Sequence, residues 1–235
     1  MKSGLLFNQI RIMIEFLTII PARKNSKRVK RKNLYLIKKK ELILYSFEHA
    51  IKTNRKKNII VNTDDEKIIK LSSKYNLNYL KRPKKLSGDK ISTEKVIKHT
   101  LIKLFGRKYH KKVKNIILLQ PTSPLRTVKN IKESIKKFKD KKYDSLFSGY
   151  LSKKFIWSNS NRLKSISYNY KKRQRTQVMK NLIFENGAIF IFSSKGFYKN
   201  ENRLFGKIGF YEMSEDQSLD LDYLRDFKLL NKILN

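Results

Sequence analysis

The chain has 235 residues, enough for one large domain, and 40% of them are hydrophobic, which is sufficient for a core. It contains no cysteine, which excludes disulfides and thiolate metal sites. No apolar run approaches the roughly 20 residues of a membrane span, and residues 1–13 lack the apolar stretch of a secretory signal. We therefore expect a soluble protein of the cytoplasm.

The charge balance is strongly basic: 56 Lys and Arg stand against 19 Asp and Glu, for a formal net charge of +37. Such a charge is typical of nucleic-acid-binding proteins. Here the basic residues spread along the whole chain, and Lys, Asn, Ile and Tyr are abundant together, as in proteins from A/T-rich genomes. We predict only non-specific, salt-dependent attraction to nucleic acids.

Strand and helix patterns alternate over the first 150 residues. Short apolar runs predict buried strands, and apolar residues three and four apart predict helices. The predicted strands are 16–20, 58–62, 77–80, 115–119 and 145–150, and the predicted helices are 42–51, 66–75, 92–105 and 128–138. Thr63 or Asp64 is expected to cap the helix at 66–75. This alternation indicates an α/β fold with a mostly parallel sheet and helices on both faces.

Residues 151–179 interrupt this pattern with a polar stretch that carries isolated aromatic residues. Within it, 162–169 is predicted to form a hairpin strand. We interpret the stretch as an excursion from the sheet that serves as a dimerisation arm. The α/β pattern resumes with a strand at 188–192, and a final helix is predicted at 223–234.

Polar residues gather at the predicted strand ends, where open α/β sheets place their ligands. The loop after the first strand carries a dense series of cations from Arg23 to Lys32, which suits a polyphosphate. The alternative is a solvated basic loop. Further strand ends carry Thr63-Asp64-Asp65, Lys81-Arg82-Pro83, Gln120-Pro121-Thr122-Ser123-Pro124 and Glu185-Asn186-Gly187-Ala188.

Asp220 and Asp222 are two residues apart, so in an extended segment their side chains share one face. Two carboxylates on one face suit Mg²⁺. The alternative is a helix N-cap plus a salt bridge to a nearby lysine. No histidine pairs with a plausible nucleophile, and the phosphate-binding glycine patterns of P-loops and dinucleotide folds are missing from the sequence.

An ordered series of motifs resembles one enzyme family. The motifs are IIPAR-x-x-SK-x-x-x-x-KN, V-x-TDDE, LKRP, LLQPTSPLR, ENGAI and S-x-D-x-D-x-x-x-DF. Spread from Leu17 to Leu230, they resemble the cytidylyltransferases that activate nonulosonic acids, namely the CMP-sialic acid synthetases and their legionaminic and pseudaminic acid relatives. The CMP-Kdo synthetases share the chemistry but carry a different first loop.

The resemblance implies a Rossmann-like domain over 14–235, after an extension at 1–13. An arm at 151–175 would exchange between the subunits of a homodimer. In the implied reaction, the anomeric hydroxyl of the sugar acid attacks the α-phosphate of CTP with Mg²⁺, and pyrophosphate leaves. A nucleic-acid-binding protein, or a degenerate protein that binds nucleotides without catalysis, is the alternative function.

The resemblance also implies roles for individual residues, carried over by motif position. The triphosphate would be held by Arg23, Ser26 and Lys32, and the cytidine would be surrounded by Asn33, Arg82 and Thr93. The sugar acid would contact Gln120 and, from the partner subunit's arm, Arg173 and Lys154. Mg²⁺ would bind Asp220 and Asp222. The residues expected to act in catalysis are Arg23, Lys32 and Asp222, the last also as proton acceptor.

Two departures from the family pattern concern the first loop and the arm. The family usually has glycine where Lys24 and Asn25 stand, so we expect altered loop geometry, with Asn25 tolerating a left-handed conformation. In the arm, the sequence starting at Arg173 matches the family pattern R-Q-D-L-P only at its first two residues.

Overall fold

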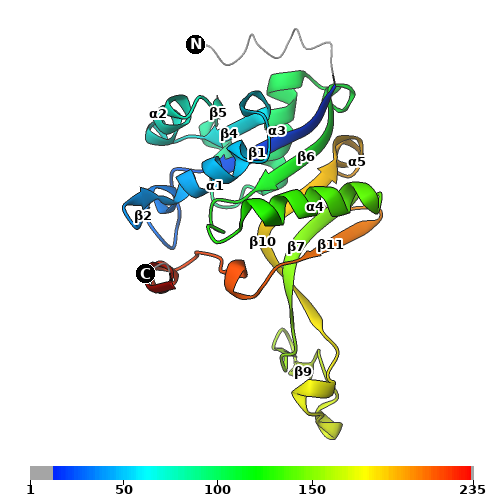
Figure 1. Cartoon of the computed structure of the whole chain (residues 1–235). Helices are drawn as coiled ribbons and strands as arrows, with labels where there is room; N and C mark the ends of the chain where they lie inside the picture. The colour runs from blue at the N-terminus through cyan, green and yellow to red at the C-terminus, as the bar shows by residue number, and fades with distance from the viewer. Residues whose placement is uncertain (1–12, 234–235) are drawn as a thin grey trace.

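Figure 1 shows the computed structural model of the protein, in which residues 13–233 are described. Its centre is a seven-stranded sheet of order β11-β7-β10-β6-β1-β4-β5. The strands are β1 (Ile14–Ala22), β4 (Ile59–Thr63), β5 (Asn78–Lys81), β6 (Val113–Leu119), β7 (Ser145–Ser152), β10 (Leu182–Ser193) and β11 (Ile208–Glu212). Only β10 runs antiparallel to its neighbours, β6 and β7. The predicted mostly parallel sheet is confirmed.

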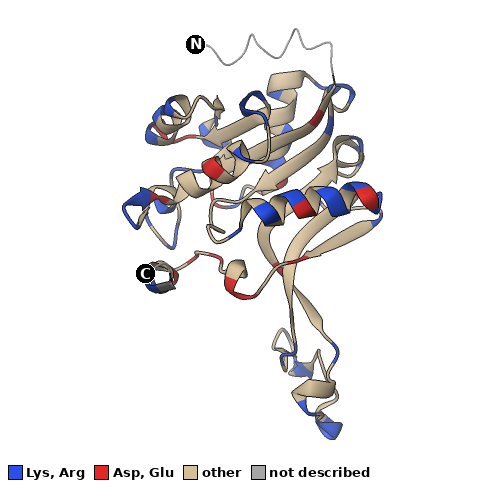
Figure 2. Ribbon diagram, viewed as in Figure 1, with Lys and Arg blue, Asp and Glu red and all other residues tan. Residues whose placement is uncertain are grey.

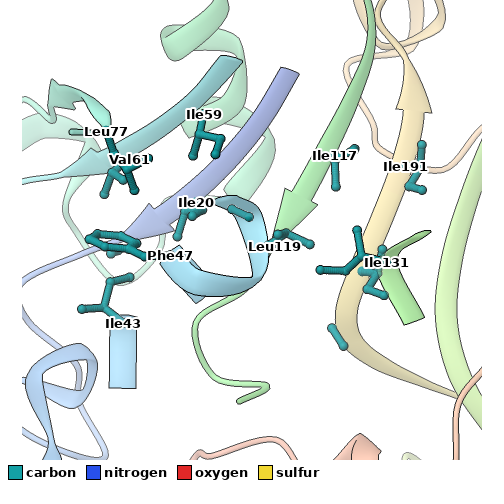
Figure 3. Packing of buried hydrophobic residues seen from close by; sticks show 14 of the residues in the cluster. Ile20, Ile43, Phe47, Ile59, Val61, Leu77, Ile117, Leu119, Ile131 and Ile191 are labelled. Atoms are coloured by element: carbon teal, nitrogen blue, oxygen red, sulfur yellow. The ribbon is translucent and has the colours of Figure 1, made fainter. Parts of the chain in front are cut away.

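Helices cover both faces of the sheet (Figure 1). They are α1 (Leu42–Ile51), α2 (Glu66–Lys74), α3 (Thr93–Phe105), α4 (Val128–Asp140), α5 (Ser194–Asn200) and α6 (Leu224–Ile233). Because side chains alternate along a strand, β1 contributes to two cores. Ile20 belongs to one core, together with Phe47 of α1 and Ile131 of α4 (Figure 3), whereas Ile19 belongs to the core on the other face, together with Ile97 of α3.

A third apolar cluster holds the C-terminal segment against the basic loop. It consists of Val29, Ile37, Leu42, Leu221, Phe227 and Leu230, all of them buried. The ring centroids of Tyr35 and Phe227 lie 4.4 Å apart. This cluster fixes the segment that contains Asp220 and Asp222 beside the loop that follows β1.

The start of α2 differs from the prediction. The N-cap is Asp65, whose Oδ1 accepts a hydrogen bond from the backbone N–H of Lys67 at 2.9 Å. Thr63 supports the turn instead, since its Oγ1 accepts from the N–H of Asp65. Asp64 is drawn to the basic loop, where its Oδ1 accepts from the N–H of Lys24 at 2.7 Å. The expectation that Thr63 or Asp64 caps this helix was therefore wrong.

The C-terminal half contains elements that the patterns did not predict. Strand β11 adds to the sheet edge beside β7, and α5 follows β10 directly. Strand β10 is also longer than the predicted 188–192, because its first residues pair with the end of β7 at the base of the arm. Its register shifts between Glu185 and Phe190, where Gly187 has a φ of 68°.

The segment between β7 and β10 extends away from the sheet as an arm (Figure 1). Its only regular pairing among the described residues joins two short strands, β8 (Trp157–Ser158) and β9 (Lys164–Ser165). The predicted hairpin strand at 162–169 is thus present only over Lys164–Ser165, where it pairs with β8. Aromatic rings hold the arm together, with Tyr168 against both Phe155 and Trp157.

Lysine and arginine residues are spread along the helices, the loops and the arm of the ribbon rather than gathered in one element (Figure 2). Residues 13–233 contain no helix with the length and apolar character needed to cross a lipid bilayer.

Candidate active site

A pocket of about 270 Å³ lies at the carboxyl ends of β1, β5 and β6. Its walls come from the loops that follow these three strands and from the start of α3. All six residues that the motifs assigned to the nucleotide line this pocket: Arg23, Ser26, Lys32, Asn33, Arg82 and Thr93. Gln120, the residue outside the arm that was assigned to the sugar acid, lines it too. The strand ends therefore gather these side chains as the parallel topology predicts.

The basic loop folds without glycine at positions 24 and 25. Neither Lys24 nor Asn25 has a positive φ, and the left-handed residue of this loop is Arg31, with φ 53°. The loop is held by the bond from Lys24 to Asp64 and by Asn33, whose Nδ2 donates to the carbonyl of Arg23 at 2.9 Å. The expected use of Asn25 in a left-handed conformation is therefore not found.

Arg23 reaches across the pocket to Asp89, a residue that the motif analysis missed. The Arg23 Nη1 to Asp89 Oδ1 distance is 2.6 Å, and Lys27 Nζ lies 3.5 Å from Oδ2 of the same carboxylate. Both partners of the closer pair are about one-third exposed, so this ion pair contributes little to stability. An arriving phosphate can therefore replace Asp89 at Arg23 at small energetic cost.

Arg82 forms a rigid part of the pocket wall. Its Nε donates to Asn62 Oδ1 at 2.6 Å and its Nη2 to the Asn62 carbonyl at 3.0 Å, while Asn62 Nδ2 donates to Thr100 Oγ1 at 2.8 Å. Burial lowers the pKa of Arg82 to about 10, against the opposing effect of Asp64, so the side chain is charged at neutral pH. A buried charge held in one orientation is suited to recognise a fixed group of a ligand.

Asp222 lies beside the pocket and contacts the basic loop. Lys32 Nζ lies 2.9 Å from its Oδ1, and Arg28 pairs with its Oδ2. Burial by itself would raise the pKa of Asp222, but the hydrogen bonds and charges of Lys32 and Arg28 outweigh it and lower that pKa. The salt bridge to a nearby lysine, considered above as the alternative to a metal ligand, is therefore present.

The same alternative included a helix N-cap at Asp220 or Asp222, but Asp226 fills that role at α6. Asp226 Oδ2 accepts from the N–H groups of Asp222 and Tyr223 at 2.8 and 2.6 Å, at the start of α6. Asp220 is held by Thr122, and the N–H of Leu221 donates to the Thr122 carbonyl at 2.9 Å. Neither Asp220 nor Asp222 therefore caps α6: Asp220 is held by Thr122, and Asp222 is paired with Lys32 and Arg28 beside the pocket.

Asp220 and Asp222 have the composition of a magnesium site that substrate completes. Among residues 13–233 no group of three or more acidic or histidine side chains forms a metal cage. Mg²⁺ is usually bound by one or two carboxylates together with substrate phosphates. Desolvation raises the pKa of Asp220, and the nearby charge of Asp222 raises it further, against Thr122 and Lys32. A divalent cation would relieve this mutual repulsion.

The two arm residues do not join the pocket of their own chain. Lys154 Nζ pairs with Glu215 Oε1 at 2.8 Å, at the base of the arm. The Arg173 guanidinium lies 4.0 Å from the ring centroid of Phe155, beside a separate hollow lined by residues 173–177. The predicted sugar site is therefore only half assembled within one chain.

Solved structures place the sheet and its pocket in one class of fold. The structure of CMP:2-keto-3-deoxy-manno-octonic acid synthetase complexed with CTP matches with a TM-score of 0.67 and 13% identity, covering 94% of this chain and 98% of that one. At this identity the likeness shows the fold alone. The crystal structure of a 4-diphosphocytidyl-2C-methyl-D-erythritol synthase shares the same fold, with a TM-score of 0.67 and 9% identity over 94% of this chain and 100% of that one.

The sequence comparisons then identify the family. The model of the family described as cytidylyltransferase matches residues 17–235, and the chain belongs to that family. An N-acylneuraminate cytidylyltransferase of Escherichia coli is 32% identical over 92% of this chain and 51% of its own length. The post-translational flagellin modification protein B of Campylobacter coli is 29% identical over 94% of this chain and 96% of its own. The chain thus spans about half the length of the E. coli relative.

Proposed function

We propose that this protein is a cytidylyltransferase that activates a nonulosonic acid, converting CTP and the sugar acid to the CMP-sugar acid and pyrophosphate. The observation that carries this proposal is the single pocket in which Arg23, Lys32, Arg82 and Gln120 meet at the strand ends. Membership of the cytidylyltransferase family supports the CTP chemistry. The E. coli relative, whose name states an N-acylneuraminate substrate, supports the class of sugar acid.

In the proposed reaction the anomeric oxygen of the sugar acid forms a bond to the α-phosphorus of CTP while the bond to pyrophosphate breaks. Both substrates are anions, so the site must reduce their repulsion. Arg23, Ser26 and Lys32 would hold the triphosphate, and Asn33, Arg82 and Thr93 would surround the cytidine. Gln120 would orient the sugar acid from the opposite side of the pocket.

The pairing of Lys32 and Arg28 with Asp222 describes the site before substrate binds. Phosphate oxygens would draw both cations away from Asp222 and so free its carboxylate. Asp222 could thus accept the proton of the anomeric hydroxyl. Together with Asp220, it would also hold Mg²⁺, which when bound neutralises phosphate charge and aligns the reacting groups.

Completion of the sugar site requires a second subunit in this proposal. The arm of the partner would bring Arg173 and Lys154 to the sugar acid, and a homodimer would then contain two such sites. Arg173 is exposed and rests on Phe155, so its guanidinium is available to an anion. CTP is a cytoplasmic nucleotide, which places the reaction in the cytoplasm.

The test is pyrophosphate release from CTP and Mg²⁺ with N-acetylneuraminic, legionaminic, pseudaminic and Kdo acids. Turnover with a nonulosonic acid is expected, and ATP should not replace CTP. In parallel, thermal stabilisation should be larger with CTP than with ATP. Equal stabilisation by both nucleotides, together with no turnover on any acid, would contradict the proposal and favour a nucleic-acid-binding protein, which has no use for a cytosine preference.

A further inference from the structure

Arg126 is a buried cation that is paired with no carboxylate among the described residues. Its side chain is fully buried, and its hydrogen bonds go only to uncharged acceptors. Burial lowers the pKa of Arg126 to about 9, which leaves it charged at neutral pH. Burying an unpaired charge is costly, so the hydrogen bonds of this guanidinium must compensate for lost hydration.

Those hydrogen bonds join three separate elements. Nη1 donates to the carbonyl of Gln120 at 3.1 Å and to the carbonyl of Ala188 at 2.6 Å. Nη2 donates to Ser46 Oγ on α1 at 2.9 Å. One planar group therefore joins the end of β6 to the bend of β10 and to α1.

The bend of β10 is the surface on which the Gln120 side chain rests. The Gln120 amide faces Gly187: the position that a Cβ would occupy on this glycine is 3.5 Å from Gln120 Oε1 and 3.7 Å from Nε2. The bend is further held by Asn186, whose Oδ1 accepts from Ser148 Oγ at 2.7 Å and from the N–H of Ala188 at 3.1 Å. Because these hydrogen bonds fix the bend, the Gln120 amide beside it is also held in one position.

We propose that Arg126 is a positioning residue that holds the Gln120 side chain against the Gly187–Ala188 bend and thereby sets the sugar-acid subsite. The identity of the ligand rests on the proposed function, whereas the positioning does not. Lysine at this position would keep the charge but lose the planar fork that reaches three acceptors at once. Arg126→Lys therefore separates positioning from charge.

The kinetic test compares Arg126→Lys, Gln120→Ala and the double variant. We expect Arg126→Lys to raise the KM for the sugar acid about tenfold, as expected for a lost charge-assisted hydrogen bond, with the KM for CTP changed by less than about twofold. Because Arg126 acts through Gln120, the double variant should be no worse than Gln120→Ala. Additive losses, or equal changes in both KM values, would overturn the proposal.

A second readout needs no turnover. The side-chain amide resonances of Gln120 in NMR spectra of the free protein should shift in Arg126→Lys and, to a smaller extent, in Ser46→Ala. Ser134→Ala is the matched control, because that buried hydroxyl donates only within α4, to the Asn130 carbonyl at 2.7 Å. If Arg126→Lys does not fold, the Gln120 resonances of Ser46→Ala, compared with those of Ser134→Ala, test the proposal instead.

These readouts separate the two proposals. Unchanged Gln120 resonances in the folded variants would overturn the positioning role. An inactive wild-type protein in which the Gln120 resonances still respond to Arg126→Lys would count against the proposed function alone.

Discussion

The pocket and the arm differ in whether their positively charged side chains have partners within the same chain. In and beside the pocket, each cation has a partner in the same chain: Arg23 has Asp89, Lys32 has Asp222 and Arg82 has Asn62. The arm, residues 151–181, contains nine Lys and Arg and no Asp, Glu or His. Two of these three pocket cations are therefore neutralised by carboxylates of the same chain, whereas among the described cations of the arm only Lys154 has such a partner, Glu215 at its base.

The two regions also differ in support. The pocket is built at the ends of strands in the central sheet, above two buried cores. The arm has strands of two residues and a small set of aromatic contacts. In the function proposed above, the rigid pocket fixes the nucleotide, and the arm supplies cations to the sugar acid of a neighbouring subunit.

The largest effect should come from the pocket side, with Asp222→Ala. Loss of this carboxylate removes one proposed metal ligand and the proton acceptor, so turnover should fall about 10³-fold. The fold should persist, because Asp222 is at the rim and the apolar cluster around Phe227 holds the segment. Pyrophosphate release and circular dichroism check both points. Asp216→Ala, an exposed acidic residue of the same segment, is the control, and equal losses would remove the special role of Asp222.

A smaller and more selective effect should come from the arm, with Arg173→Ala. We expect a loss of about 10- to 100-fold in kcat/KM for the sugar acid, the range of one charge-assisted contact, with CTP binding unchanged. Arg162→Ala provides a matched control, since this exposed arginine lies elsewhere on the arm. If Arg173→Ala weakens CTP binding as much as turnover, the division between pocket and arm is wrong.

The smallest effect concerns the pH dependence of stability and involves a histidine. It is confined to the domain outside the arm, because all three histidines lie there. Burial, with the charges of Arg126, Lys40 and Lys52, lowers the pKa of His49 to about 3. Below pH 6.5 the unfolded chain binds a proton here and the folded chain does not, so the free energy of unfolding falls as the pH falls toward 3. At pH 5 this loss is about 2 kcal/mol.

His49→Gln removes that titration. Urea unfolding at pH 7 and pH 5 should show the stability difference between wild type and variant changing by about 2 kcal/mol across this interval. Parallel pH dependences of the two proteins would mean that His49 does not stay neutral in the folded state.

The strand ends explain how much of the site was predictable. Parallel strands bring their carboxyl ends to one edge, so Arg23, Arg82 and Gln120 could be expected together from their positions after apolar runs. Chain order could not reveal partners distant in sequence. Asp89 pairs with Arg23 from beyond the Lys81-Arg82-Pro83 motif that follows β5, and Arg126, which follows β6, bonds to Ala188 on the neighbouring strand β10.

Local patterns also fail where tertiary pairing decides. Strand β11 was missed because half of its residues face solvent at the sheet edge, and only its pairing with β7 makes it a strand. Likewise, several polar side chains can serve as a cap after a strand, and the bond from Lys24 that draws Asp64 away leaves Asp65 to cap α2. The family motifs placed the site residues, but they gave no sign of which contacts fix them.

The most direct test of this account mixes two inactive subunits. Asp222→Ala and Arg173→Ala proteins, carrying different tags, are co-expressed, and pyrophosphate release from CTP and the preferred sugar acid is measured. If a site combines one subunit's pocket with its partner's arm, each mixed dimer has one intact site of two, and activity should recover to about a quarter of wild type. Mixed dimers that form, as the tags would show, but stay as inactive as either parent would contradict the account.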